Sequence, residues 1–237
     1  MDDNAPATRL TRLVADSARW REIEHLEVAD STNAVVADHQ TAGRGRFGRR
    51  WEDRPGGSLL VSCLVDTPAR PTLVPLAAGL AVADSVGSAG AEPELKWPND
   101  VLVAGRKCAG VLVEACTHQL VIGIGVNVDW RGAVSPGSWT SLAEELGHQV
   151  DRWDVLVDLL RALDRRLAQG PDDVLADYRE VCSTLGRNVV VEGPARTIVG
   201  LALDVDERGA LAVRTDDRVL SLDSGDVAHL RPTASGS

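Results

Sequence analysis

The chain has 237 residues, a formal net charge of -10 at pH 7, 44% hydrophobic residues and 25% charged residues. That length accommodates one domain of ordinary size and a small companion, and the composition is typical of a water-soluble globular protein. The acidic balance excludes the general electrostatic attraction on which nonspecific nucleic-acid binding depends.

The first residues, MDDNAPATRLTRLV, are acidic and contain no long apolar run. We therefore predict a cytoplasmic protein with neither a secretory signal nor a membrane span. The four cysteines show no CxxC spacing, and Cys63, Cys108 and Cys116 lie among apolar residues. This pattern predicts buried, reduced thiols rather than disulfides or metal ligands.

Hydrophobic periodicity predicts alternating helices and strands in the first half of the chain. We expect helices at residues 8–18 and 71–88, and strands at residues 20–28, 34–40, 58–66, 93–97, 99–103, 107–116 and 119–128. The second helix begins with Pro71 and carries an apolar face. Because almost no residues separate the first two strands, we expect little more than a turn between them.

The second half of the chain changes in texture at Gly186. Before it, two helices are expected at residues 151–170 and 171–186, the first beginning at Asp151 and ending at Gly170. After it, short strand patterns alternate with glycine-containing turns, which is typical of a small β-barrel of about fifty residues. We therefore predict two domains, residues 1–184 and residues 185–232.

The stretch TAGRGRFGRRWED, residues 41–53, concentrates arginines and glycines in an otherwise acidic chain. Its GRGRFG matches the dinucleotide-binding GxGxxG pattern, but the residues that follow are too short and too rich in Pro and Gly for the crossover helix. Single-stranded nucleic-acid binding and a merely solvated loop are further interpretations. Glycine lets backbone N–H groups turn toward an anion, and arginine supplies forked donors for phosphate. With Trp51 following, the loop suits a small phosphate-bearing ligand with an aromatic base.

Only two of the 25 Lys and Arg residues are lysines, Lys96 and Lys107, and both lie within a dozen residues of each other. An ammonium is a compact point charge that the planar guanidinium does not reproduce, so a chemical reason is one explanation and chance is the other. These lysines fall in two of four ordered motifs, QTAGRGRFGRRW, KWPNDVL, GRKCAGVLVE and IGIGVNV. Together the four motifs resemble those of biotin protein ligases.

The resemblance implies an α+β fold, with a mixed-sheet catalytic domain related to class II aminoacyl-tRNA synthetases and a small C-terminal SH3-like β-barrel. It implies that biotin and MgATP form biotinyl-5′-AMP, from which biotin passes to a lysine of the biotin carboxyl carrier domain of an acetyl-CoA (acyl-CoA) carboxylase. The chain resembles the ligase-only type, without a DNA-binding domain, acting as a monomer or homodimer. Lipoate or octanoyl transfer on the same fold, or a noncatalytic biotin- or nucleotide-binding module, are the alternatives.

Site residues are implied by the same resemblance. The catalytic residues would be Lys107, Arg44 and Arg46. Biotin would contact Ser31, Thr32, Asn33, Gln40, Arg44, Gly45, Arg46, Lys107, Gly110, Gly123 and Gly125. ATP would contact Trp51, against adenine, with Lys96, Asn99, Asp100 and Asn127, and Mg²⁺ would bind Asp100 and Asn127. In one departure, the family's DSTN opens a helix, whereas here Asn33 is followed at once by AVVADHQ.

Overall fold

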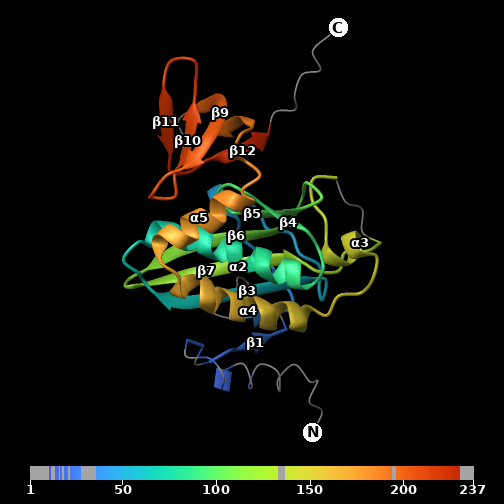
Figure 1. The fold of residues 1–237 in the computed structure, drawn as a ribbon. Helices are drawn as coiled ribbons and strands as arrows, with labels where there is room; N and C mark the ends of the chain where they lie inside the picture. The colour runs from blue at the N-terminus through green and yellow to red at the C-terminus, as the bar shows by residue number, and fades with distance from the viewer. Residues whose placement is uncertain are drawn as a thin grey trace.

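The computed structural model describes residues 11, 14–15, 17, 19–20, 22–27, 36–132, 137–193 and 196–229. Within them, two β-sheets and a helical layer form the molecule (Figure 1). The strands of the larger sheet are β1 (His25–Leu26), β2 (Val36–Ala37), β3 (Ser58–Asp66), β4 (Pro93–Lys96), β5 (Asp100–Val103), β6 (Arg106–Cys116) and β7 (Gln119–Asn127). The helices are α2 (Val74–Ser88), α3 (Leu142–Leu146), α4 (Arg152–Ala168) and α5 (Pro171–Val181). The smaller sheet contains β8 (Asn188–Glu192), β9 (Thr197–Val205), β10 (Leu211–Arg214), β11 (Val219–Leu222) and β12 (Asp226–His229).

The larger sheet is mixed and has the strand order β1-β2-β3-β7-β6-β5-β4. β1 and β2 are parallel, and every other neighbouring pair is antiparallel. The smaller sheet is antiparallel, in the order β11-β10-β9-β8-β12. The prediction of an α+β fold with a separate C-terminal β-domain is therefore confirmed.

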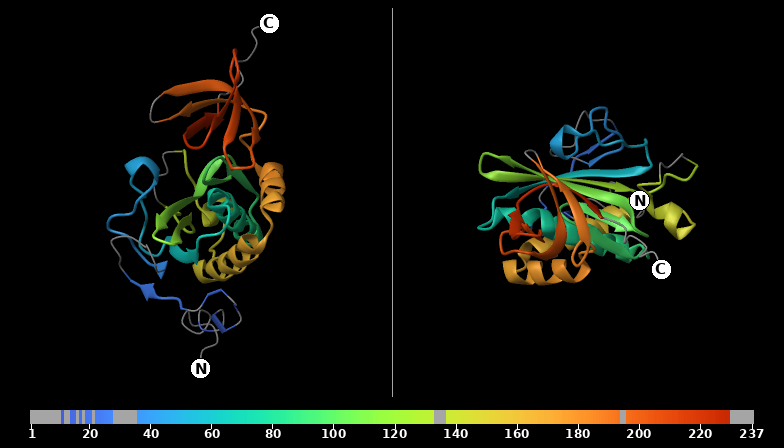
Figure 2. Two further views of the ribbon diagram at one scale, coloured as in Figure 1. Left: turned by 90° about the vertical axis from the view of Figure 1, so that its left-hand side faces the viewer. Right: turned by 90° about the horizontal axis from the view of Figure 1, so that it is seen from above.

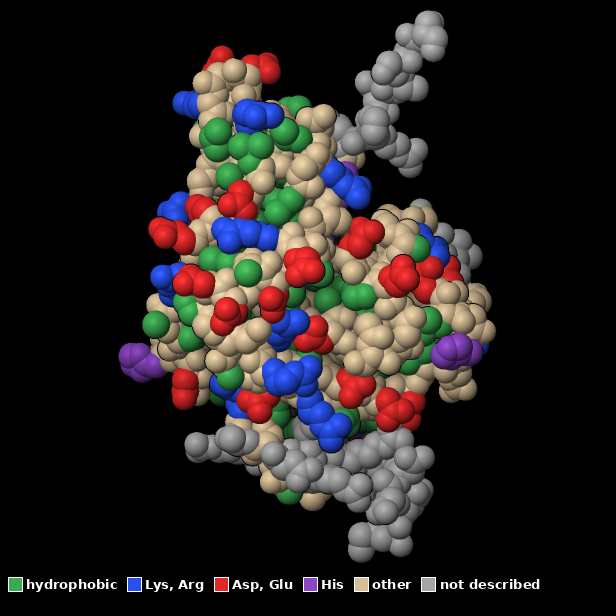
Figure 3. All heavy atoms as spheres, viewed as in Figure 1, with side chains coloured by type: hydrophobic (Ala, Val, Ile, Leu, Met, Phe, Trp, Pro, Cys, Tyr) green, Lys and Arg blue, Asp and Glu red, His purple; other side chains and the backbone are tan. Residues whose placement is uncertain are grey.

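Helices α2 and α4 cover one face of the larger sheet, and the loop of residues 41–53 lies against the other (Figure 2). α2 is apolar on nearly all sides because it is enclosed between the sheet and α4. Arg166 of α4 forms ion pairs with Asp84 of α2 and Asp177 of α5, which ties the three helices together. Acidic and basic side chains are interspersed over this outer helical surface (Figure 3). No described helix is long and apolar enough to cross a membrane.

The N-terminal strands differ from the prediction. Of residues 20–28 and 34–40, only His25–Leu26 and Val36–Ala37 are strands among the described residues. Their parallel pairing is incompatible with a tight turn, because parallel neighbours need a connection that returns to the same end of the sheet. The expected turn between them was therefore wrong. Most of the predicted helix at residues 8–18, and all of the DSTN motif, lie outside the described residues.

The helix ends also need correction. Asp151 caps α4 as expected, with its carboxylate accepting from the Trp153 amide, but Gly170 does not end that helix in a left-handed conformation. It has φ -64° and occupies the N-cap of α5, which ends at Val181 rather than near residue 186. The short helix α3 was missed, although Ser141, accepting from the Glu144 amide, is a recognisable N-cap.

The two sheets are joined by buried contacts. Trp97 is 1% exposed, and its Nε1 donates to the carbonyl oxygen of Gly209 in the β9–β10 turn at 3.0 Å. Thr184 Oγ1 accepts from the Trp97 amide and hydrogen-bonds His229 of β12. Because apolar side chains of both sheets belong to one core cluster, the barrel is held firmly against the strand that leads into KWPND.

Candidate active site

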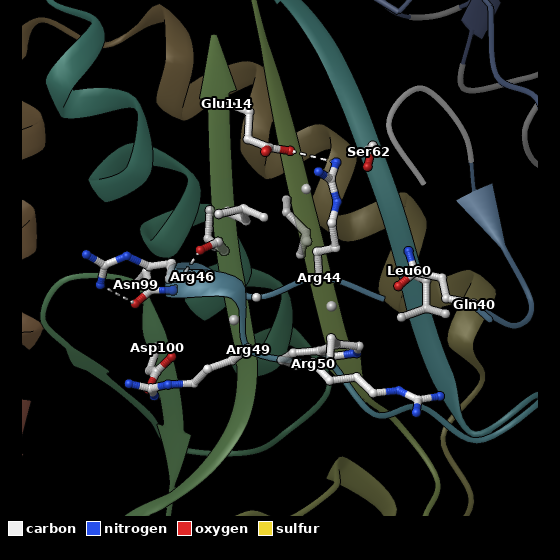
Figure 4. A pocket seen from close by; sticks show the side chains of 18 of the residues that line it. Gln40, Arg44, Arg46, Arg49, Arg50, Leu60, Ser62, Asn99, Asp100 and Glu114 are labelled. Carbon is white, nitrogen blue, oxygen red and sulfur yellow. Dashed lines mark hydrogen bonds and ion pairs between the residues drawn. The ribbon is translucent and has the colours of Figure 1, made fainter. Parts of the chain in front are cut away.

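A pocket lies on the side of the larger sheet that the helices leave uncovered, beneath the loop of residues 41–53 (Figure 4). Its floor is a row of residues in direct register across four strands: Leu60 of β3, Gly125 of β7, Gly110 of β6 and Asp100 of β5. Side chains alternate in direction along a strand, so these positions share one face. Two glycines in the middle of the row leave the floor low at its centre.

Trp51 occupies the space above that floor. A Cβ atom placed on Gly125 would lie 2.5 Å from the indole ring, and one placed on Gly110 would lie 3.1 Å from it. The Trp51 Nε1–H is buried and finds no acceptor among the described residues. A buried donor without a partner costs about 1–3 kcal/mol, which a ligand acceptor would recover. The glycines thus make room for the indole, whose unpaired Nε1–H lies beside Gly125.

Three cations of the pocket pair with carboxylates. Lys107 Nζ lies 2.6 Å from Asp100 Oδ1 and 5.5 Å from the centroid of the Trp51 ring. Arg44 Nη2 lies 3.2 Å from Glu114 Oε2 at the far end of the floor. Arg49, in the same loop, forms an ion pair with a carboxylate of the small barrel, Asp226.

Arg46 is held differently. Its Nη1 donates to Asn99 Oδ1 and to the carbonyl oxygen of Gly225, both at 3.2 Å, and within the described part of the chain it forms no ion pair. Burial lowers the pKa of the Arg46 guanidinium, against the opposing charge of Asp100, but an arginine of such basicity stays protonated. Neutral acceptors therefore orient a cation whose charge remains available to an anion in the pocket.

The chain is also similar to known proteins in sequence and in structure. Residues 14–127 match the Biotin/lipoate A/B protein ligase family, and residues 184–230 match the biotin protein ligase C-terminal domain. The chain is 36% identical to a biotin–[acetyl-CoA-carboxylase] ligase of Mycobacterium tuberculosis, over 93% of each chain. The chain belongs to the biotin protein ligase family. A biotin protein ligase from Aquifex aeolicus in complex with biotin and ATP superimposes with a TM-score of 0.79 at 29% identity, covering 89% of this chain and 99% of that one.

The pocket brings together most of the site residues that the family resemblance implied. The predicted residues that line it are Gln40, Arg44, Gly45, Arg46, Trp51, Asn99, Asp100, Lys107, Gly110, Gly123 and Gly125. The Trp51 ring contacts Gly110 and Gly125, two of the glycines that were predicted to contact biotin. Its role against adenine stays a prediction.

Two predicted residues lie outside the lining. Asn127 is buried, and its amide group donates to the carbonyl oxygen of Thr140 at 2.9 Å. Lys96 pairs in register with Asp100, and burial lowers the pKa of its ammonium while the charge of Asp100 raises it. Ser31, Thr32 and Asn33 lie outside the described residues.

Sequence reasoning missed several pocket residues that only folding assembles. They are Leu60, Ser62, Val111, Leu112, Glu114, Ile124 and Asp226, whereas Arg49 and Arg50, which also line the pocket, belong to the arginine and glycine loop that the sequence had singled out. It also missed Trp139, whose backbone pairs with that of Lys107 and whose ring packs edge-on against Trp130. Two tryptophans within a loop rich in glycine and proline, between a strand and a helix, were the available signal for that aromatic pair.

The two side chains predicted to bind Mg²⁺ can be compared with the ligands that this ion requires. Mg²⁺ in nucleotide sites is held by one or two carboxylates together with substrate phosphates. Asp100 fits this role because its carboxylate lines the pocket, whereas Asn127 is buried outside the lining. No cluster of three or more His, Cys, Asp or Glu side chains suited to a metal occurs among the described residues.

Proposed function

We propose that this chain is a biotin–protein ligase that activates biotin with MgATP and transfers it to a lysine of the biotin carboxyl carrier domain of an acyl-CoA carboxylase. The observation that carries the proposal is the convergence of Lys107 and Arg46 on a glycine floor, beside the nucleotide-type motif KWPND. Membership of the biotin protein ligase family, whose relatives include enzymes named for acetyl-CoA carboxylase, supports the same reaction.

The first half-reaction joins two anions. A carboxylate oxygen of biotin attacks the α-phosphorus of ATP, the bond from that phosphorus to the bridging oxygen breaks, and pyrophosphate leaves with the electron pair. Two unit charges of like sign 4 Å apart repel by about 4 kcal/mol at an effective dielectric constant of 20. Positioned cations that remove this repulsion therefore supply much of the catalysis.

Lys107 is the residue we assign to the meeting point of the two anions. Its ammonium stands beside the floor glycine Gly110 and is held by Asp100 at 2.6 Å. Arg46, which forms no ion pair among the described residues, would meet the phosphate from above. Bound Mg²⁺ would supply further positive charge to the phosphates, with Asp100 as its protein ligand.

Direct attack by biotin suits the thiol chemistry of this chain. Burial raises the pKa of the Cys63 thiol and of the Cys108 thiol to about 12 in each case. A thiol with so high a pKa is a poor nucleophile at neutral pH, because the thiolate is the reactive form. Neither cysteine lines the pocket either, so neither thiol is placed to compete with biotin for the phosphorus.

The second half-reaction transfers biotin from the anhydride to the carrier lysine. Its amine attacks the biotinyl carbonyl carbon, and AMP leaves. A loop closed over the intermediate would keep water from the anhydride until the carrier arrives. We assign the ligase chemistry to residues 1–184 and propose that residues 185–232 form a supporting domain.

Pyrophosphate release from the intact chain tests the proposal. Release is measured with biotin, with lipoate, with octanoate and without any acid, each in the presence of MgATP. We expect release only with biotin, followed by labelling of a carrier domain that has its lysine. Release with lipoate or octanoate would assign the lipoate or octanoyl reaction instead, and absence of release under all conditions would indicate a noncatalytic binding module.

A further inference from the structure

The small barrel contributes a wall to the candidate active site. The turn after β11, residues 223–225, leads into Asp226, whose side chain lines the pocket. Two arginines of the loop contact this turn and the residue that follows it. Arg46 Nη1 donates to the carbonyl oxygen of Gly225 at 3.2 Å, and Arg49 forms an ion pair with Asp226. Residues almost 180 positions apart in the chain thus meet above the pocket floor.

The barrel side of this contact is rigid. A Cβ atom on Gly225 would clash with Val191 Cγ1, so the turn is packed directly against β8. Asp226 and Val227 pair in register with Glu192 and Val191, and both valines are buried in the barrel core. The Gly225 carbonyl and the Asp226 carboxylate are therefore anchored by strand pairing and by packing.

The loop side is held more weakly. Its single 3₁₀ turn, Arg46–Gly48, buries no residue, and Phe47 adopts a positive φ of 56° with half of its side chain exposed. A backbone hydrogen bond from Gly45 to the carbonyl oxygen of Arg49, at 2.7 Å, closes the loop on itself. The Arg46 guanidinium lies over the Phe47 ring, 4.9 Å from its centroid, but Phe47 is itself exposed, so this contact does not fix the loop against the rest of the molecule.

The two arginines meet different partners on the turn. The Gly225 carbonyl is neutral, so it orients Arg46 without cancelling the charge that a phosphate would need. Asp226 cancels the charge of Arg49, and this exposed pair fixes the loop rather than binding a ligand. Arg49 thus anchors the loop, and the charge of Arg46 remains available to an anion.

We propose that the barrel turn positions the loop: Asp226 anchors it through Arg49, and the Gly225 carbonyl aims Arg46 at the ligand's phosphate. Asp226 is then a positioning residue of the reaction, contributed by the small domain. The assignment of a phosphate to Arg46 rests on the proposed function, whereas the docking of the loop on the turn does not.

Limited trypsin digestion of the ligand-free chain tests the docking alone, because trypsin cleaves after arginine and the loop contains four. Cleavage follows the population of the undocked loop. Asp226→Asn should speed cleavage within residues 44–50 by about 1.5- to fivefold, the range for losing an exposed ion pair. Asp223→Asn is the matched control, because this carboxylate of the same turn faces Arg208 of the barrel at 3.9 Å. Equal cleavage of the Asp226→Asn variant and the wild type, or an equal rise with Asp223→Asn, would overturn the proposal.

The rate at which biotinyl-5′-AMP leaves the enzyme tests the consequence for the reaction. Asp226→Asn and Arg49→Gln should each speed release and raise the KM for ATP by a similar small factor, with an unchanged melting temperature. The double variant should release no faster than the faster single variant, because both changes remove one contact. Multiplying effects would contradict the anchoring pair. If the wild type forms no biotinyl-5′-AMP, the proposed function fails, while the trypsin comparison still decides the docking.

Discussion

The pocket floor and the loop above it are held in place by different forces. The central floor strands β3, β6 and β7 pair in long antiparallel ladders, and their side chains on the helix-covered face are buried, which leaves the floor little freedom. The loop of residues 41–53 has two backbone hydrogen bonds across it and is otherwise held by side-chain contacts, among them those of Arg44 to Glu114, Arg46 to Asn99 and Gly225, and Arg49 to Asp226. From this difference we infer that the floor determines which ligand fits, and that the loop determines how long the ligand stays bound.

The strongest test of the floor is to fill it. Gly125→Ala places a methyl group 2.5 Å from the Trp51 ring, so the indole must leave its position and the floor rises. We expect kcat/KM for biotin to fall on the order of 100-fold or more, since small misplacements at a reacting centre are that costly. Gly123→Ala, in the same strand, would meet Leu112 O at 3.4 Å and should cost far less. Equal losses in the two variants would show that the floor row is not special.

Lys107→Arg tests the cation that stands between floor and loop. Both residues are positively charged, but the larger planar fork should displace the carboxylate from the α-phosphate, lowering the adenylation rate about 100-fold. Pyrophosphate release measures it. Lys96→Arg, outside the pocket lining, should lose less activity. Adenylation by Lys107→Arg at the wild-type rate would mean that positive charge alone suffices.

Arg46→Gly tests the loop without touching the floor. Biotin recognition should persist, whereas biotinyl-5′-AMP should leave about tenfold faster, the lower end for losing a hydrogen bond to a charged group. The two readouts are biotin binding by calorimetry and the release rate of the intermediate. An unchanged release rate would mean that Arg46 is only a solvated charge. Loss of biotin binding would mean that Arg46, like the floor, determines whether biotin fits.

The smallest effect concerns the pH dependence of the barrel that supports the loop. Burial lowers the pKa of His229, with further lowering by the charges of Lys96 and Arg187. As the pH falls, His229 is therefore protonated in the unfolded chain before it is protonated in the folded chain. The stability that depends on a neutral His229 is fully present above about pH 6.5 and declines as the pH falls below that value. His229→Gln should flatten the fall of the melting temperature between pH 7 and 5. An identical fall in both proteins would contradict this.

The long central elements were predictable from local patterns. Strands β3, β6 and β7 are apolar runs bounded by turn residues, and α4 begins at its predicted cap, Asp151. Prediction failed where tertiary contacts override local preference. Gly170 resembles a helix end, but the helix that follows it uses it as an N-cap. The valines and alanine after Asn33 resemble a strand that continues to residue 40, yet among the described residues β2 covers only Val36–Ala37, and it pairs in parallel with β1.

The sequence by itself determined the chemistry of this protein: the arginine and glycine loop, the two lysines and the four ordered motifs of a biotin protein ligase. These signals are local, since residue type and spacing along one segment carry them. Only the tertiary structure decided which charges meet. Strand register placed Asp100, Gly110, Gly125 and Leu60 in one row, and barrel packing brought Asp226 to Arg49. Register and domain packing depend on burying apolar surface far along the chain, and no single segment contains that information.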